Sequence, residues 1–166
     1  HLPKHLDDIG QTASIGAMAV ALIGLFNLVG SLGAGALGAA HSRTRLLSLI
    51  YGLRAVVIAA FIILPASSLA SLVFGAVMGL LWLSTVPLTS GVVMAQFGVA
   101  HAGTLFGIAF LSHQVGAFAG IAGGGWVRDA TGSYEAWWWV QVALGVLGAL
   151  LHLVIDDAPA PAATGA

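Results

Sequence analysis

The stretch GAGALGAAHSRTRLL, residues 33–47, contains two of the five Lys and Arg residues in a chain of 166 residues. These two, Arg43 and Arg45, lie between two long apolar runs. Charge that is this sparse and this localised is typical of a connection between membrane-spanning helices, because the ~30 Å hydrocarbon core of a bilayer excludes charged side chains. The stretch therefore indicates a chain that folds in lipid.

The composition of the whole chain supports the same interpretation. Hydrophobic residues make up 59% of the sequence and charged residues 7%, whereas a soluble domain carries about 25% charged residues to cover its surface. We therefore predict an all-α polytopic membrane protein in contact with the lipid bilayer. The net charge of −1 offers no basic surface for nucleic acid, and the absence of cysteine excludes disulfides and thiolate metal sites. We expect no nucleic-acid partner, no cofactor and no metal.

Five apolar runs are long enough to cross a bilayer, which takes about 20 residues of helix. Their length and their lack of alternation favour helices over strands. The predicted spans, which place a transmembrane bundle within residues 1–155, are about 14–38, 46–64, 69–94, 104–124 and 136–155. Residues 156–166 are polar and rich in Pro and Ala, and are predicted to be a disordered tail. We interpret the chain, which starts at histidine, as a piece of a longer protein.

Small residues recur at helical spacing in two of these runs, and each set predicts a stripe along one helix face. Such stripes let helix backbones approach closely in lipid. The two sets are Gly116, Gly120 and Gly124, and Gly24, Asn27, Ser31, Gly35 and Gly38. We expect a tightly packed bundle. Asn27 either forms a hydrogen bond between helices or contacts a ligand.

His113 is the ionisable residue expected closest to the bilayer midplane, with Gln114 beside it. It lies about nine residues into its run, roughly 14 Å at about 1.5 Å per residue. Ionisable groups at this depth are costly and are functional candidates. His113 could bind an anionic substrate when protonated or relay a proton. Alternatively, it donates an interhelical hydrogen bond on the face that carries Gly116 and Gly120. The residues leave these alternatives open.

Arg54 and the stretch WLSTVPLTSG, residues 82–91, supply the remaining candidates. The guanidinium of Arg54 either extends to the membrane interface or faces a water-filled cavity. Pro87 lacks the N–H that would reach the carbonyl of Leu83, so it predicts a helix kink. Thr85 and neighbouring hydroxyls could satisfy the freed backbone groups or line a substrate site, as in the broken helices of transporters. Trp82 could stack on a substrate or fill the core.

An intramembrane serine protease is an alternative from a different functional class. The pattern His113-x-x-Gly116-x-x-x-Gly120 resembles the helix that carries the catalytic base in rhomboid proteases. Thr89-Ser90-Gly91 resembles part of their Gly-x-Ser-Gly nucleophile motif, but the first glycine is replaced by Leu88. We therefore expect the chain not to be an enzyme. Labelling of Ser90 by a fluorophosphonate would support the protease alternative.

The arginine-containing stretch resembles the loop motif of the major facilitator superfamily, Gly-x-Leu-Ala-Asp-Arg-x-Gly-Arg-Arg. The acidic and first basic positions of that motif are Ala39 and Ala40 here. The residues that carry the resemblance are Gly35, Leu37, Gly38, Arg43 and Arg45.

The segment GGGWVRDATGSY, residues 123–134, resembles the linker before the last helix of the same family. Together the two resemblances cover the chain as the end of helix seven (residues 1–6) through helix twelve, the C-terminal half of a twelve-helix bundle. The matching linker residues are Asp129, Thr131, Gly132, Ser133 and Tyr134.

This resemblance implies a secondary active transporter that moves a small molecule by alternating access, in the cytoplasmic (plasma) membrane, with the arginine loop on the cytoplasmic side. It implies that the missing N-terminal half of the same chain is a partner. It also implies a substrate cavity near Asn27, Trp82, Thr85 and His113. Some members of the family use intramembrane cations to bind organic anions, a role that Arg54 or His113 would play here. A membrane fragment with packing contacts and no activity is a further alternative.

Overall fold

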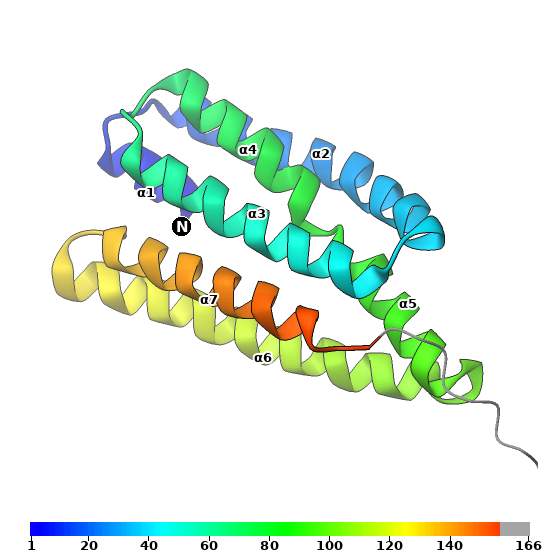
Figure 1. Cartoon of the computed structure of the whole chain (residues 1–166). Helices are drawn as coiled ribbons and strands as arrows, with labels where there is room; N and C mark the ends of the chain where they lie inside the picture. The colour runs from blue at the N-terminus through cyan, green and yellow to red at the C-terminus, as the bar shows by residue number, and fades with distance from the viewer. Residues whose placement is uncertain (157–166) are drawn as a thin grey trace, which may run out of the picture.

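The computed structural model describes residues 1–156, which form helices joined by short connections and, within that range, no strand (Figure 1). The all-α fold predicted from the sequence is confirmed. Residues 157–166, to which most of the predicted disordered tail belongs, lie outside the described residues. The helices are α1 (Leu2–Asp8), α2 (Ala13–Ala40), α3 (Arg43–Ile63), α4 (Ser68–Trp82), α5 (Thr85–Phe97), α6 (Val99–Thr131) and α7 (Glu135–Leu153).

Five segments of the described chain are long and apolar enough to cross a membrane. They are α2, α3, α4 together with α5, α6 and α7. The chain is therefore an all-α membrane protein, as its composition predicts. Most helix ends lie within a few residues of the predicted span ends, because the apolar runs and the helices stop at the same polar connections.

Helix α6 differs most from its predicted span. It covers Val99–Thr131, whereas the apolar run suggested about 104–124. The segments AQFGVAHAG (95–103) and GWVRDATGSY (125–134) are helical for most of their length rather than connections. Gly98 and Gly132, with φ of 74° and 77°, bound the helix because a positive φ is strained for other residues. Hydropathy locates the lipid-exposed part of a helix and misses the polar turns beyond it.

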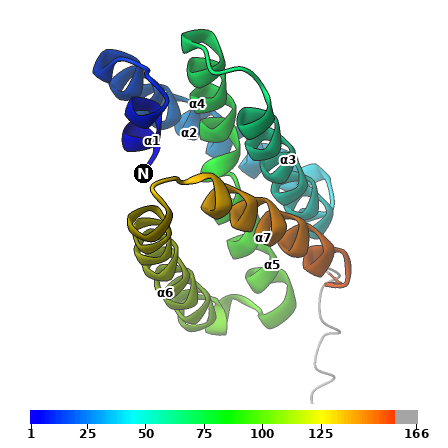
Figure 2. The same ribbon diagram turned by 90° about the vertical axis from the view of Figure 1, so that its left-hand side faces the viewer.

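The helices pack mainly as two pairs, α2 with α4 and α3 with α7, which lie side by side in Figures 1 and 2. Two buried clusters connect these pairs. One contains residues of α2, α3 and α5, namely Ala34, Leu47, Ile50, Leu88 and Val92. The other is built around Ile58, Phe74 and Met78, with Phe61 and Trp138 packed against it. Trp138 thus fills an interhelical contact between α7 and its neighbours.

Glycines at the α2–α4 contact allow the two backbones to approach closely. A Cβ atom added to Gly75 or Gly79 of α4 would lie 2.6 Å from the carbonyl oxygen of Ala19 or Ile23, respectively. A Cβ atom added to Gly30 of α2 would lie 2.0 Å from the carbonyl oxygen of Leu80. Real Cβ atoms do not come this close to backbone, so these positions require glycine in this packing.

Two of the three glycines in the predicted stripe of α6 face no neighbouring helix within the described chain. A Cβ atom at Gly116 or Gly120 would have nothing within 4 Å, and only at Gly124 would it meet other atoms, those of Trp137 and His1. Gly124 is also the one buried residue of α6. The four-residue spacing correctly marks one helix face, but spacing alone does not tell which face a neighbour covers.

Candidate functional site

The candidate site lies where the third apolar segment is interrupted between α4 and α5. Helix α4 ends at Trp82, and α5 begins at Thr85 after Leu83 and Ser84. The interruption lies just before Pro87, which the sequence analysis expected to kink this helix. Because Pro87 has no N–H to donate, the carbonyl of Leu83 instead accepts from the N–H of Val86 at 3.1 Å. The break frees backbone groups that lipid cannot satisfy.

Polar side chains satisfy several of these freed groups. The backbone N–H of Leu83 donates to Oδ1 of Asn27, on α2, at 3.2 Å. The hydroxyl of Ser84 donates to the carbonyl of Leu80, and the hydroxyl of Thr85 donates to the carbonyl of Trp82 at 3.5 Å. Asn27 therefore forms a hydrogen bond between α2 and the break, which is one of the two alternatives that its sequence position left open.

Arg54, on α3, reaches the end of α4 with its guanidinium group. Its Nε donates to the carbonyl of Leu81 at 3.2 Å, and its Nη2 donates to the carbonyls of Leu81 and Trp82. The guanidinium carbon also lies 5.1 Å from the ring centroid of Tyr51. The C-terminal end of a helix carries partial negative charge, so a cation is favourable there. Arg54 therefore turns inward and caps a helix end instead of extending to the interface.

The charge of Arg54 is balanced by backbone carbonyls and not by a carboxylate. No ion pair of Arg54 occurs among residues 1–156, where the ion pairs involve Lys4 and Arg128. The hydrogen bonds of the guanidinium within this range come from Nε and Nη2, and Nη1 makes none. The guanidinium therefore keeps donors that the described residues do not use.

Trp82 completes the set at the break. Its side chain is 53% exposed, so its indole does not serve as core. The structure thus brings together four residues that the sequence suggested separately, from α2, α3 and the α4–α5 break. They are Asn27, Arg54, Trp82 and Thr85.

His113 and Gln114 are not part of this cluster. Both are exposed in the middle of α6. The ring of His113 lies 6.0 Å from the ring of Phe110 on the same helix, and the described residues offer it no hydrogen bond to another helix. Ser90 and His113, the pair weighed for a protease, are likewise not joined by a hydrogen bond in residues 1–156.

The arginine loop and the end of α2 pack against α5. A Cβ atom at Gly38 would lie 2.6 Å from Cδ2 of Leu88, and one at Gly35 would lie 3.9 Å from Cβ of Pro87. The side chain of Arg43 occupies the space beside Gly91, where a Cβ atom would lie 2.6 Å from its Nε. Leu37 and Arg45 are exposed. Gly35, Gly38 and Arg43 therefore pack against α5, the helix that follows the break.

Sequence analysis missed the glycines that hold α2 against α4 and the partners of Arg54. The pattern Gly75-x-x-x-Gly79 carries the same spacing signal as the stripe in α6 and could have been noticed. The carbonyls that Arg54 binds carry no such signal, because every residue has a carbonyl group.

Replacing Asn27 with leucine should destabilise the protein, because the N–H of Leu83 loses its acceptor at the helix break. We expect the free energy of unfolding in detergent micelles to fall by about 1–3 kcal/mol. Gln114→Leu is the matched control, since Gln114 is exposed on α6 and should change stability little. Equal effects of the two substitutions would remove Asn27 from the break.

Comparisons with protein-family models, with curated proteins and with solved structures find no match to this chain. Function is therefore inferred from the residues and their geometry.

Proposed function

We propose that this chain is part of a secondary active transporter that moves a small organic anion across a membrane by alternating access. The observation that carries the proposal is the guanidinium of Arg54 at the helix break, with Nη1 free and no carboxylate paired with it in residues 1–156. Intramembrane cations pair with carboxylates or backbone carbonyls or mark a substrate pathway, and the unused donors of Arg54 support the last of these roles.

The other residues of the break suit the same ligand. A planar guanidinium binds a carboxylate through two parallel hydrogen bonds, and Nη1 has two hydrogens to offer. The exposed indole of Trp82 offers an apolar face for the body of a small organic molecule. A broken helix whose freed groups are held by side chains is also the way many transporters build a site at membrane depth.

The resemblance of the arginine loop and of residues 123–134 to the major facilitator superfamily supports a transport function. On this proposal the chain is the C-terminal half of the bundle in the plasma membrane, with the loop of Arg43 and Arg45 on the cytoplasmic side. The missing N-terminal half would supply the opposite wall of the cavity. His113 and Gln114, exposed on α6, would then face that half or the cavity between the halves.

Substrate class can be tested with the full-length protein in proteoliposomes. We expect small carboxylates to be taken up and to compete with one another, whereas an amine and a neutral sugar of similar size should neither be transported nor compete. The expected preference follows from the single positive charge at the break. Equal uptake of the amine, or uptake of the sugar alone, would contradict an anion site.

A further inference from the structure

Helix α1 connects two sides of the bundle at the end opposite the arginine loop. It packs on α2, where a Cβ atom at Gly16 would lie 3.5 Å from Pro3, and its residue Leu6 is fully buried. On its other side, α1 contacts the α6–α7 corner, residues 128–135. The ring of His1, just before α1, forms hydrogen bonds through Nδ1 with the hydroxyl of Tyr134 at 3.2 Å and through Nε2 with the carbonyl of Ile121, further back on α6, at 2.9 Å. Figure 2 shows α1 between α2 and this corner.

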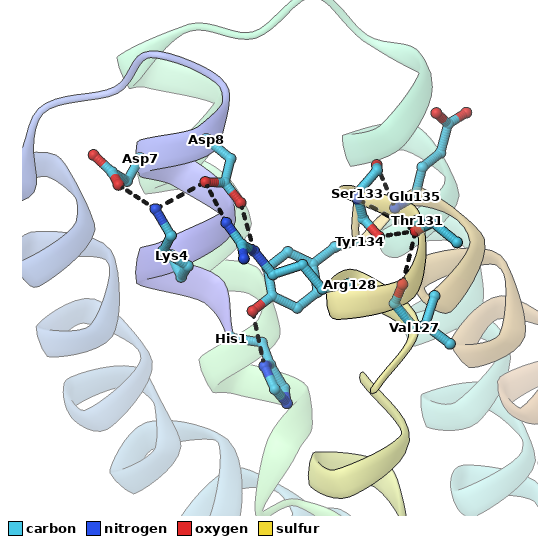
Figure 3. A network of polar contacts seen from close by, with 10 residues as sticks. All are labelled: His1, Lys4, Asp7, Asp8, Val127, Arg128, Thr131, Ser133, Tyr134 and Glu135. Atoms are coloured by element: carbon cyan, nitrogen blue, oxygen red, sulfur yellow. Dashed lines mark hydrogen bonds and ion pairs between the residues drawn. The ribbon is translucent and has the colours of Figure 1, made fainter. Parts of the chain in front are cut away.

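An ion-pair network fastens α1 to the corner (Figure 3). Arg128 donates from Nε and Nη2 to the two carboxylate oxygens of Asp8 at 3.0 and 3.1 Å. Lys4 bridges Asp8 at 2.9 Å and Asp7 at 2.7 Å. Hydrogen bonds from Arg128 and then Lys4 lower the pKa of Asp8 to about 2. The stabilisation from Asp8 is therefore complete above the ordinary carboxyl pKa and is lost only as the pH falls toward 2.

His5 forms the second connection, through its ring. The centroid of its imidazole ring lies 5.8 Å from the ring centroid of Phe61 on α3, 6.1 Å from that of Tyr134 and 5.5 Å from that of Trp138 on α7. All three pairs are edge-on. The ring is half-buried and makes no hydrogen bond to any of residues 1–156. It also borders a cavity of about 320 Å³ that Glu135 and Trp138 line. Three aromatic contacts thus hold a titratable ring that has no polar partner.

The charged and titratable groups around His5 come from two elements. Asp8 acts on the charge of His5, Tyr134 contacts its ring, and Glu135 lines the same cavity. The other such groups are His1, Lys4 and Asp7 at α1 and Arg128 and Asp129 at the corner. Helix α3 contributes the ring of Phe61 to this contact and Ile62 to the adjoining cavity. Burial lowers the pKa of His5, and the charge of Asp8 opposes this effect without overcoming it. The docked α1 therefore favours the neutral imidazole.

We propose that α1 is an acid-released clasp: at neutral pH it joins α2 to the α6–α7 corner, and protonation of His5 between the three aromatic rings detaches it. The sign follows from linkage. Docking of α1 is at full strength above the ordinary pKa of histidine and weakens as the pH falls from there to the lower pKa of docked His5. The docking equilibrium constant falls in total by tenfold for each unit that separates these two pKa values. The Asp8–Arg128 pair stays ionised over this range, and the His5→Phe background separates the effect of His5 from that of His1, whose ring bonds with Tyr134 and Ile121.

Thiol accessibility tests the clasp independently of transport. The chain has no cysteine, so Leu6→Cys introduces one thiol at a fully buried position of α1. Its alkylation rate by a water-soluble maleimide should rise between about pH 7.5 and about pH 5, relative to an Ala136→Cys thiol, which is exposed. In the His5→Phe background, which keeps an aromatic ring but cannot be protonated, this pH-dependent rise should disappear.

Comparison at each pH of Leu6→Cys with and without His5→Phe cancels the pH dependence of the thiol chemistry. Where phenylalanine impairs insertion, His5→Leu serves in its place. Arg128→Ala should raise the alkylation rate at both pH values, and the exchanged pair Asp8→Arg with Arg128→Asp should lower it again. The proposal is overturned by a Leu6→Cys rate that, relative to the Ala136→Cys rate at the same pH, does not rise on acidification, or by an equal relative rise in the His5→Phe background.

Discussion

Replacing Arg54 with glutamine should reduce uptake by the full-length protein roughly ten- to a hundredfold, through loss of charge-assisted hydrogen bonds of about 1.5–3 kcal/mol. Glutamine removes the positive charge at the break and the Nη1 donors that are free for an anion. It can still donate to one of the carbonyls at the end of α4. The loss should therefore fall mainly on substrate binding rather than on folding.

Arg54→Lys distinguishes charge from geometry. Lysine keeps the positive charge but lacks the planar fork that binds two carbonyls and a carboxylate together. We expect intermediate uptake with a raised KM for the substrate. Uptake is to be measured in proteoliposomes at equal amounts of folded protein, judged by size-exclusion chromatography.

Arg45→Gln is the matched control for charge, because Arg45 is an exposed arginine at the start of the same helix. It should leave uptake close to that of the wild type. Normal uptake by a folded Arg54→Gln variant would remove Arg54 from the substrate site. Loss of folding in Arg54→Gln, with normal uptake by Arg54→Lys, would reduce Arg54 to a cap of α4.

Replacing Gly30 with alanine should destabilise the protein more than other single-methyl additions in the same helix. The new Cβ atom would lie 2.0 Å from the carbonyl oxygen of Leu80, so α2 and α4 must move apart. Overpacking of this kind costs about 1–3 kcal/mol. The moved α4 would also shift the carbonyls of Leu81 and Trp82 away from Arg54. We expect a lower unfolding temperature in detergent and reduced uptake together.

Gly33→Ala is the matched control, because a Cβ atom at Gly33 has nothing within 4 Å in the described chain. Alanine is favoured over glycine inside a helix by roughly 0.5–1 kcal/mol, so this variant should be as stable as the wild type or slightly more stable. Equal unfolding temperatures of the Gly30 and Gly33 variants would show that α2 and α4 are not in close contact.

The candidate site could be predicted from the sequence as individual residues but not as an arrangement. Asn27 and Arg54 were identified as polar groups at membrane depth, and Trp82 and Thr85 because they lie near Pro87. His113, the ionisable residue expected closest to the midplane, is instead exposed and has no hydrogen bond to another helix in residues 1–156. Depth in a bilayer follows from position along one run, whereas the partners of a side chain depend on residues in other runs.

The clasp illustrates the same limit at the end of the bundle. The predicted spans leave Asp8 and Arg128 outside the apolar runs. It carries no signal that the two charges, 120 positions apart, are joined. Nor does the sequence predict that His5 lies among rings from α3 and α7, because aromatic residues near helix ends are common in membrane proteins.

The sequence by itself determined that this chain is all-helical and folds in lipid, since hydropathy, charge position and span length are properties of the chain read in order. Pro87 marked the region of the break for the same reason, because a missing N–H is local. Only the tertiary structure decided that α2 packs on α4, that two of the three glycines in the α6 stripe face no neighbouring helix in the described chain, and that Arg54 binds the end of α4. Those outcomes depend on which helix faces meet, and close packing between distant segments selects the faces.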